Sequence, residues 1–266
     1  MNYAEFQKQA RLSRQDICRK VFTDNRKPIW VKKENTVVKN LERIFSATLK
    51  ISNNKGFQAM SMRDLGRETN LSIGALYSYF SSKEELLAML QHQRSTITKR
   101  ILHEHIDKES DPAAKLQAAI LTHLYLSEAM QPWFYFSYME AKNLSKEEQA
   151  LAVAGERYTE QIYADILIQG QANGSFMLRD PQLTASVIKA MVQDWYLKRS
   201  KYAGRKISVD QYARFVLQFV ESFILDVKEN MQYLNPDKPE LTIESFEDSE
   251  NMPIQFFCHK MHKNNS

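Results

Sequence analysis

Residue types that commonly carry catalysis occur in this sequence without the spacing that catalysis needs. The chain contains no glycine-rich phosphate loop, no nucleophile elbow and no His-Glu-x-x-His zinc motif. Two pairs of adjacent glutamates, at 84–85 and 147–148, lie at predicted helix starts, where the helix dipole favours negative charge. The sequence therefore predicts a protein that is not an enzyme and uses no cofactor.

One group of potential metal ligands, Cys258, His259 and His262, lies close to the C-terminus. Thiolate and imidazole are ligands that zinc prefers, which would favour a metal site. Against this, no fourth ligand is nearby, and ordering a terminal segment costs conformational entropy. We therefore predict no metal site and interpret residues 231–266, which contain three prolines, as a loosely ordered tail.

The stretch 61–90 predicts two short helices that are joined by a tight turn and followed at once by a third helix. Ser61 and Asp64 have the spacing of a capping box, which starts the first helix. Asn70 tolerates the positive φ that a tight turn requires. Ser72 caps the second helix, and another capping box follows it. These local signals predict a helix-turn-helix.

The second of these helices, residues 73–80, has an inward and an outward face. Leu76 and Phe80 are four residues apart and are expected in the core, which leaves Ile73 and Tyr77 facing outward. In helix-turn-helix proteins the second helix enters the major groove of DNA. The outward face is therefore predicted to read DNA.

The run LYSYF at 76–80, followed by SKE at 82–84 and LL at 86–87, resembles the N-terminal domain of the tetracycline-repressor (TetR) family of bacterial regulators. The sequence departs from the family pattern at Gly66, where alanine is usual, and at Asn70, where glycine is usual. Neither departure removes a predicted contact residue. The alternative is a plain helical hairpin in an unrelated protein.

This resemblance implies an all-α fold with an N-terminal helix-turn-helix DNA-binding domain at 35–90 and a larger helical domain at 91–230 that binds an effector and dimerises. The implied partners are a double-stranded DNA operator, a small-molecule effector and a second copy of the chain, with no membrane. The expected function is that of a cytoplasmic repressor released from DNA by a lipophilic or aromatic effector. The alternative is a structural or protein-interaction protein that binds DNA and has no effector.

DNA contacts can be assigned by side-chain chemistry. The helix at 73–80 contains no Arg, Asn, Gln or Lys, so polar contacts from it to bases must be sparse. Ile73 and Ala75 suit thymine methyl groups, whereas Tyr77, Tyr79 and Lys83 suit phosphates. In the family, the position that matches Arg63 often contacts a base. The predicted DNA-binding residues are Arg63, Ser72, Ile73, Gly74, Ala75, Tyr77, Tyr79 and Lys83.

An aromatic-rich run at 131–140 predicts a ligand pocket, because five aromatic side chains there cannot all face one core. A pocket with a few polar groups is the usual form of a ligand site. Dense packing between helices is the alternative. The predicted ligand-binding residues are Trp133, Phe134, Phe136, Tyr138, Glu140, Tyr158, Gln161 and Trp195.

The last two predicted helices suggest a dimer interface. Asp180 and Pro181 form a helix start, and Ser208 caps a final helix whose residues 209–227 are apolar on nearly every side. A helix without a polar face must be covered all round. We therefore predict a four-helix bundle that two copies form across a two-fold axis.

Composition and charge fit this organisation. With 266 residues, 43% hydrophobic and 26% charged, the chain has the composition of an ordinary globular protein. Residues 1–100 contain 19 Lys and Arg against 9 Asp and Glu, whereas residues 101–266 contain 17 against 23. The basic extension at 1–34 is either an arm that reaches the DNA minor groove or a solvated or self-associating tail. The only cysteines, Cys18 and Cys258, fit a reducing cytoplasm.

Overall fold

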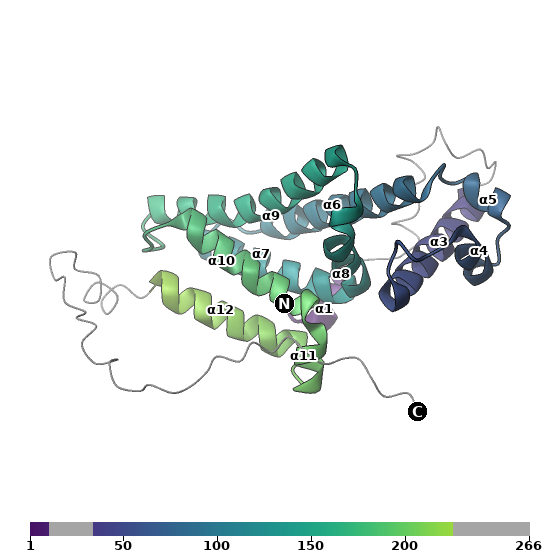
Figure 1. The fold of residues 1–266 in the computed structure, drawn as a ribbon. Coiled ribbons are helices and arrows are strands. Elements are labelled where there is room, and N and C mark those ends of the chain that lie inside the picture. The colour runs from purple at the N-terminus through teal and green to yellow at the C-terminus, as the bar shows by residue number, and fades with distance from the viewer. Residues whose placement is uncertain (11–33, 226–266) are drawn as a thin grey trace, which may run out of the picture. The chain divides into compact units, whose positions relative to one another are not determined.

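The computed structural model describes residues 1–10 and 34–225, which form helices without any strand (Figure 1). In chain order they are α1 (Tyr3–Ala10), α3 (Glu34–Lys55), α4 (Met62–Thr69), α5 (Ile73–Tyr77), α6 (Lys83–Ile106), α7 (Pro112–Ala129), α8 (Gln131–Glu140), the 3-10 turn η1 (Ala141–Asn143), α9 (Lys146–Ala172), α10 (Pro181–Leu197), α11 (Arg199–Gly204) and α12 (Val209–Leu225). The predicted all-α fold is confirmed. Not one of these helices is both long and apolar enough to span a membrane. The predicted tail at 231–266, with its cysteine and two histidines, lies outside the described residues.

Local signals determine the helix-turn-helix. The Ser61 side chain accepts a hydrogen bond from the Asp64 N–H at 3.1 Å, and the Asp64 carboxylate accepts one from the Ser61 N–H at 2.9 Å. This confirms the predicted capping box. Asn70 has the left-handed conformation expected of the turn, with φ 53°. The second helix is shorter than predicted, because α5 ends at Tyr77, although Phe80 is still buried as expected.

Gly66 has a packing role in this turn. A Cβ atom added to Gly66 would lie 2.9 Å from the backbone oxygen of Leu71, closer than real Cβ atoms approach. The N–H of Leu71 also donates to the Gly66 oxygen at 3.1 Å. Glycine at this position therefore allows the end of the turn to approach α4 closely, which offsets its weak helix propensity.

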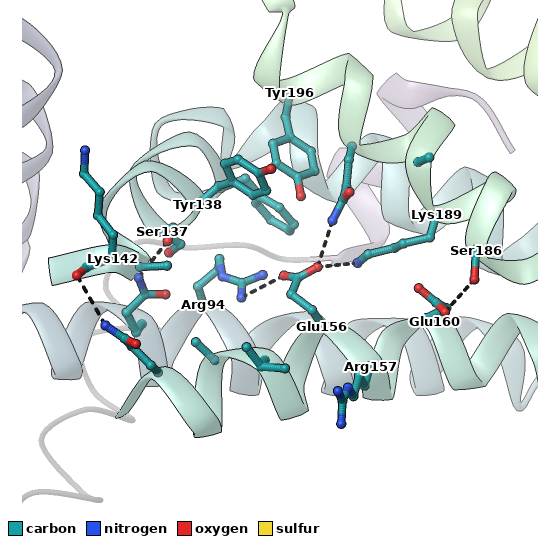
Figure 2. A pocket seen from close by; sticks show the side chains of 18 residues that line it. Arg94, Ser137, Tyr138, Lys142, Glu156, Arg157, Glu160, Ser186, Lys189 and Tyr196 are labelled. Carbon is teal, nitrogen blue, oxygen red and sulfur yellow. Dashed lines mark hydrogen bonds and ion pairs between the residues drawn. The ribbon is translucent and has the colours of Figure 1, made fainter. Parts of the chain in front are cut away.

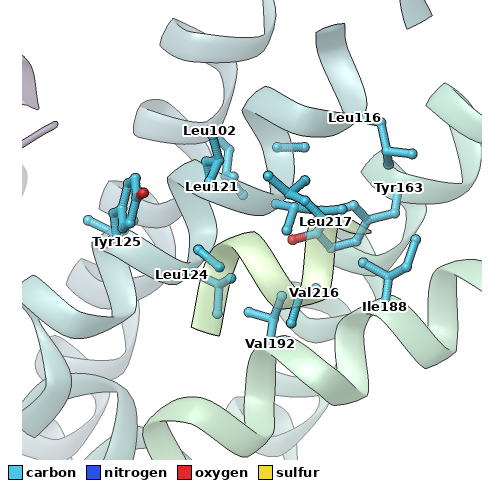
Figure 3. Packing of buried hydrophobic residues seen from close by; sticks show 14 of the residues in the cluster. Leu102, Leu116, Leu121, Leu124, Tyr125, Tyr163, Ile188, Val192, Val216 and Leu217 are labelled. Carbon is cyan, nitrogen blue, oxygen red and sulfur yellow. The ribbon is translucent and has the colours of Figure 1, made fainter. Parts of the chain in front are cut away.

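Buried apolar side chains of the described residues fall into two clusters. The first joins α3, α4, α5 and the start of α6, and it includes Leu41, Leu65, Leu76 and Leu90. We call this first part the head. The second cluster joins α6, α7, α9, α10 and α12, and Figure 3 shows part of it. Helix α6 contributes to both clusters, because Leu90 lies in the first and Ile97 in the second.

Helix α1 packs on the second cluster. Phe6 is fully buried, with its ring centre 5.6 Å from that of His105 and 5.8 Å from that of Tyr125. The N–H of Tyr3 donates to Asp210 Oδ1 at 2.9 Å, and Tyr125 Oη donates to the same oxygen at 2.7 Å. This corrects the sequence interpretation for α1, which is neither an arm on DNA nor a solvated tail. The rest of the basic extension lies outside the described residues.

We expect Phe6→Ala to release α1 from α7 and α12. Truncating a fully buried phenylalanine removes about 3 to 5 kcal/mol of packing, and an isolated helix of eight residues is not stable in water. Amide hydrogen exchange followed by mass spectrometry should show lost protection in residues 3–10. Lys8→Ala, at an exposed position of the same helix, is the control and should leave protection unchanged. Equal exchange in the two variants would contradict the packing role of Phe6.

Candidate DNA-binding surface and ligand cavity

The exposed side of α5, with the start of α4, is the surface that the sequence assigned to DNA. Ile73 and Tyr77 leave 41% and 49% of their surface exposed. A Cβ atom added to Gly74 would meet nothing within 4 Å, so no packing within the described residues requires glycine there. Arg63 and Ser72 are exposed beside them. These five residues are accessible to DNA, and their contacts with it stay a prediction.

The other three residues predicted to contact DNA are less accessible. Tyr79 is buried, and its Oη accepts a hydrogen bond from Asn40 Nδ2 at 2.7 Å. The expectation that Tyr79 faces phosphates was wrong, because α5 ends two residues earlier and the chain turns this side chain into the core. Lys83 is half-buried, with its Nζ donating to the Gln58 oxygen at 3.1 Å. Ala75 is half-buried as well.

A cavity of about 580 Å³ lies among α6, α8, α9 and α10 (Figure 2). Volumes of this size are typical of sites for drug-sized ligands. Phe134 and Tyr196 line its buried inner part. Tyr138 and Val153 line its rim, where they leave about half of their surface exposed. The cavity is therefore partly buried and partly open to solvent.

The aromatic run of α8 divides between this cavity and the head. Phe134 and Tyr138, four residues apart, share the face of α8 that lines the cavity. Trp133 and Phe136 were expected there too, but they belong to the other face. They pack edge to face on aromatic rings in and just after α3, at 5.6 and 5.7 Å between ring centres. Helix α8 is thus shared by the cavity and the head.

The predicted ligand residues of α9 point away from the cavity. Tyr158 is exposed, with its Oη 2.6 Å from His103 Nε2, and Gln161 is exposed and donates to a neighbouring aspartate. Glu156 and Glu160 of the same helix line the cavity instead. Neighbouring positions of an α-helix differ by about 100° in direction, so a shift of one or two residues selects a different face.

The two remaining predicted ligand residues have structural partners. Glu140 is buried, and its Oε1 accepts a hydrogen bond from the N–H of Phe57 at 3.2 Å, which joins α8 to the head. Trp195 is fully buried outside the cavity, and its Nε1 donates to Glu128 at 3.0 Å. Tyr196, the next residue along α10, lines the cavity instead.

A cluster of three charged side chains in the cavity wall was missed in the sequence. Glu156 Oε1 lies 3.3 Å from Arg94 Nη2, and Glu156 Oε2 lies 3.0 Å from Lys189 Nζ (Figure 2). Arg94 and Lys189 are each more than nine tenths buried. A signal was present, because Arg94 continues the apolar stripe of Leu90 and Ile97 on α6. A cation on such a stripe needs a buried partner.

The three charges perturb one another. Burial raises the pKa of Glu156, but the charges of Lys189 and Arg94 outweigh this effect and hold its pKa below the usual value. Burial lowers the pKa of Lys189, and the neighbouring carboxylate opposes that shift. Further hydrogen bonds join Gln193 to Glu156 at 3.1 Å and Lys189 to Thr159 at 2.6 Å. Glu160, which also lines the cavity, is a second carboxylate whose negative charge acts on Lys189.

Two family profiles match this chain. The profile described as bacterial regulatory proteins of the tetR family matches residues 44–90. The profile described as a tetracyclin repressor-like C-terminal domain matches residues 109–220. The first region contains α4 and α5, and the second contains most of the helices that surround the cavity.

Relatives and solved structures agree with these profiles. The HTH-type transcriptional regulator HbdR from Aromatoleum sp. (strain CIB) is 21% identical over 182 residues, which are 68% of this chain and 80% of HbdR. The crystal structure of AibR with isovaleryl coenzyme A and operator DNA matches with a TM-score of 0.60 at 18% identity, over 68% of this chain and 97% of AibR. FadR from Bacillus subtilis with stearoyl-CoA matches with a TM-score of 0.57 at 18% identity, over 68% of this chain and 98% of FadR. Because profiles match both the head and the helical region that follows it, the chain belongs to the TetR family of DNA-binding transcriptional regulators.

Proposed function

We propose that this protein is a homodimeric transcriptional repressor that a small amphipathic molecule releases from its operator. The observation that carries this proposal is the double packing of α8. Phe134 and Tyr138 line the cavity, while Trp133 and Phe136 of the same helix pack on the head. A ligand that displaces the first pair therefore moves the second pair against α3. Packed interfaces change by discrete steps, so a small displacement can reposition the head.

Helix α6 provides a second connection. It begins directly after the turn that follows α5, and it lines the cavity with Gln91 and Arg94. Gln91 Nε2 donates to the backbone oxygen of Ser137 at 2.8 Å, which joins α6 to α8 beside the cavity. AibR forms a complex with isovaleryl coenzyme A and FadR one with stearoyl-CoA, which supports an amphipathic effector for this fold.

Exposed apolar side chains on α10 and α12 support a dimer. Leu183 and Val187 of α10 leave 63% and 47% of their surface exposed, and Phe215, Phe219 and Phe223 of α12 leave 65%, 52% and 51% exposed. Contiguous apolar surface of this kind marks an interface. A second copy that packs the same two helices on this surface would form a four-helix bundle and would place two heads on one duplex.

The alternative function is that of a structural DNA-binding protein with a filled core and no effector. A solidly packed helical region would favour it. The cavity of about 580 Å³, with buried charges in its wall, favours an effector instead.

The proposed function can be tested without knowing the operator. Selection from random duplex DNA by the purified full-length protein should enrich an inverted repeat, as two symmetry-related heads require. Compounds that occupy the cavity should then release the protein from the selected DNA. Enrichment of no sequence, or release by no compound of an acyl and aromatic library, would contradict the proposal.

We expect Arg63→Ala to relax sequence preference at one base pair of each half-site. Loss of a bidentate contact to a base costs about 1 to 3 kcal/mol on the selected sequence and little on scrambled DNA. Lys83→Ala should instead weaken binding to selected and scrambled DNA alike. It should also make the slope of the logarithm of the binding constant against the logarithm of salt concentration shallower by about one unit. Binding titrations at several salt concentrations measure both effects.

Lys198→Ala removes the same charge outside the head and is the control for these titrations. It should change neither preference nor salt dependence. If Arg63→Ala weakened binding to selected and scrambled DNA equally, this arginine would contact phosphate only.

We expect Phe219→Glu to convert the protein into a monomer at micromolar concentration. A carboxylate placed in the proposed bundle would lose its hydration without gaining a partner, which is strongly unfavourable. Analytical ultracentrifugation measures the change, and operator affinity should fall with it. Gln117→Glu, at an exposed position of α7, adds the same charge elsewhere and should remain a dimer. A wild-type monomer would rule out the interface.

A further inference from the structure

The lining of the cavity contains more cations than carboxylates: Arg94, Lys142, Arg157 and Lys189 against Glu156 and Glu160. Arg94 and Lys189 are both more than nine tenths buried, and they share the single carboxylate of Glu156. A buried charge without full compensation is costly. Because both cations line the cavity, a bound anion could supply the missing charge.

Two polar atoms beside this cluster lack a partner among the described residues. Arg94 Nε and Ser137 Oγ are buried, and neither makes a hydrogen bond there. Both residues line the cavity, and both atoms, which lie beneath its surface, can donate to an acceptor once their side chains rotate toward it. Unsatisfied buried polar groups are rare in folded proteins. A carboxylate accepts several hydrogen bonds and carries a negative charge. It would therefore provide both the missing hydrogen-bond acceptor and the missing charge.

The rest of the wall is suited to an apolar ligand body. Phe134, Ala190 and Tyr196 lie in the wall beside the charged residues, and Val153 lies at the rim. A small inorganic anion would fill only a minor part of about 580 Å³. The cavity therefore combines an anion site with an apolar path that leads to solvent.

We propose that the effector is an amphipathic monocarboxylate whose carboxylate binds Arg94 and Lys189 in the cavity wall. This inference rests on the proposed function and adds the chemical class of the effector to it. The apolar body of the ligand extends past Phe134 and Tyr196 toward the rim.

Glu156 gives this site a regulatory role. Its carboxylate, on α9, holds Arg94 of α6 and both Lys189 and Gln193 of α10, so it joins three helices. A ligand carboxylate at the same two cations competes with Glu156 and weakens these connections. Helix α6 runs directly from this cluster to the head. The competition therefore changes how α6 packs against the head.

Matched ligands test the charge requirement with the full-length protein. We expect octanoate and 4-phenylbutyrate to bind in isothermal titration calorimetry about tenfold or more tightly than octanamide and 4-phenylbutyramide, because each amide lacks one charge-assisted hydrogen bond. The two acids should also release selected operator DNA. Octanoyl-CoA, in which the acyl carboxylate is replaced by a thioester, should bind more weakly than octanoate.

Matched variants test the residues. Lys189→Met should weaken octanoate binding about tenfold and leave octanamide binding unchanged. Glu156→Gln should strengthen octanoate binding about tenfold, because it removes the competing carboxylate. A merely damaged cavity would not bind the acid more tightly. Lys198→Met removes an exposed charge just after α10 and is the control. Circular dichroism melting checks that each variant is folded, and Arg94→Gln replaces Lys189→Met if that protein does not fold.

Several outcomes would overturn the inference. Equal binding of acids and amides, tighter binding of octanoyl-CoA than octanoate, absence of acid binding at millimolar concentration, or weaker acid binding by Glu156→Gln would each exclude a carboxylate at this cluster. Release of DNA by the amides or the thioester would leave the proposed function intact but would refute the proposal that the effector is a carboxylate. Failure of any compound to release DNA would count against the proposed function itself.

Discussion

The packing of α8 between two hydrophobic clusters is the constraint on which the rest of the structure depends. One face of this short helix completes the core of the head, and the other forms the wall of the cavity. A helix of ten residues cannot bend independently on its two sides, so a displacement on one face is transmitted to the other. The hydrogen bond between Glu140 and Phe57 adds a polar connection at the end of α8. This arrangement gives a physical basis for communication between ligand and DNA.

The buried charges of the cavity are better explained by binding than by stability. Replacing a buried ion pair with apolar side chains is often neutral or stabilising, so such a pair is weak support for a structural role. Here the cavity lining has four cations and two carboxylates, so positive charge remains beside the ion pairs of Glu156. The cost of the remaining charge is offset when an anion binds. The same cluster joins α6, α9 and α10, so ligand binding and helix arrangement depend on the same contacts.

Helix α1 extends the second hydrophobic cluster beyond the regions that the family profiles match. The first matched region begins at residue 44, whereas Phe6 is buried among α6 and α7. The Tyr3 N–H and the Tyr125 hydroxyl both donate hydrogen bonds to Asp210, which connect α1 and α7 to α12. Helix α1 therefore packs on α6, α7 and α12 and is not free to bind DNA.

The sequence by itself determined the head, because its signals act within a few residues. Capping at Ser61 and Ser72 and the left-handed turn at Asn70 depend on hydrogen bonds and backbone sterics that neighbouring residues supply. Only the tertiary structure decided which side chains meet in the cavity. Trp195 and Tyr196 are adjacent and equally aromatic, yet the rotation of α10 in the packed structure sends only Tyr196 to the cavity. Such rotations are set by contacts between helices that are distant in sequence, and one residue of shift changes the direction by about 100°.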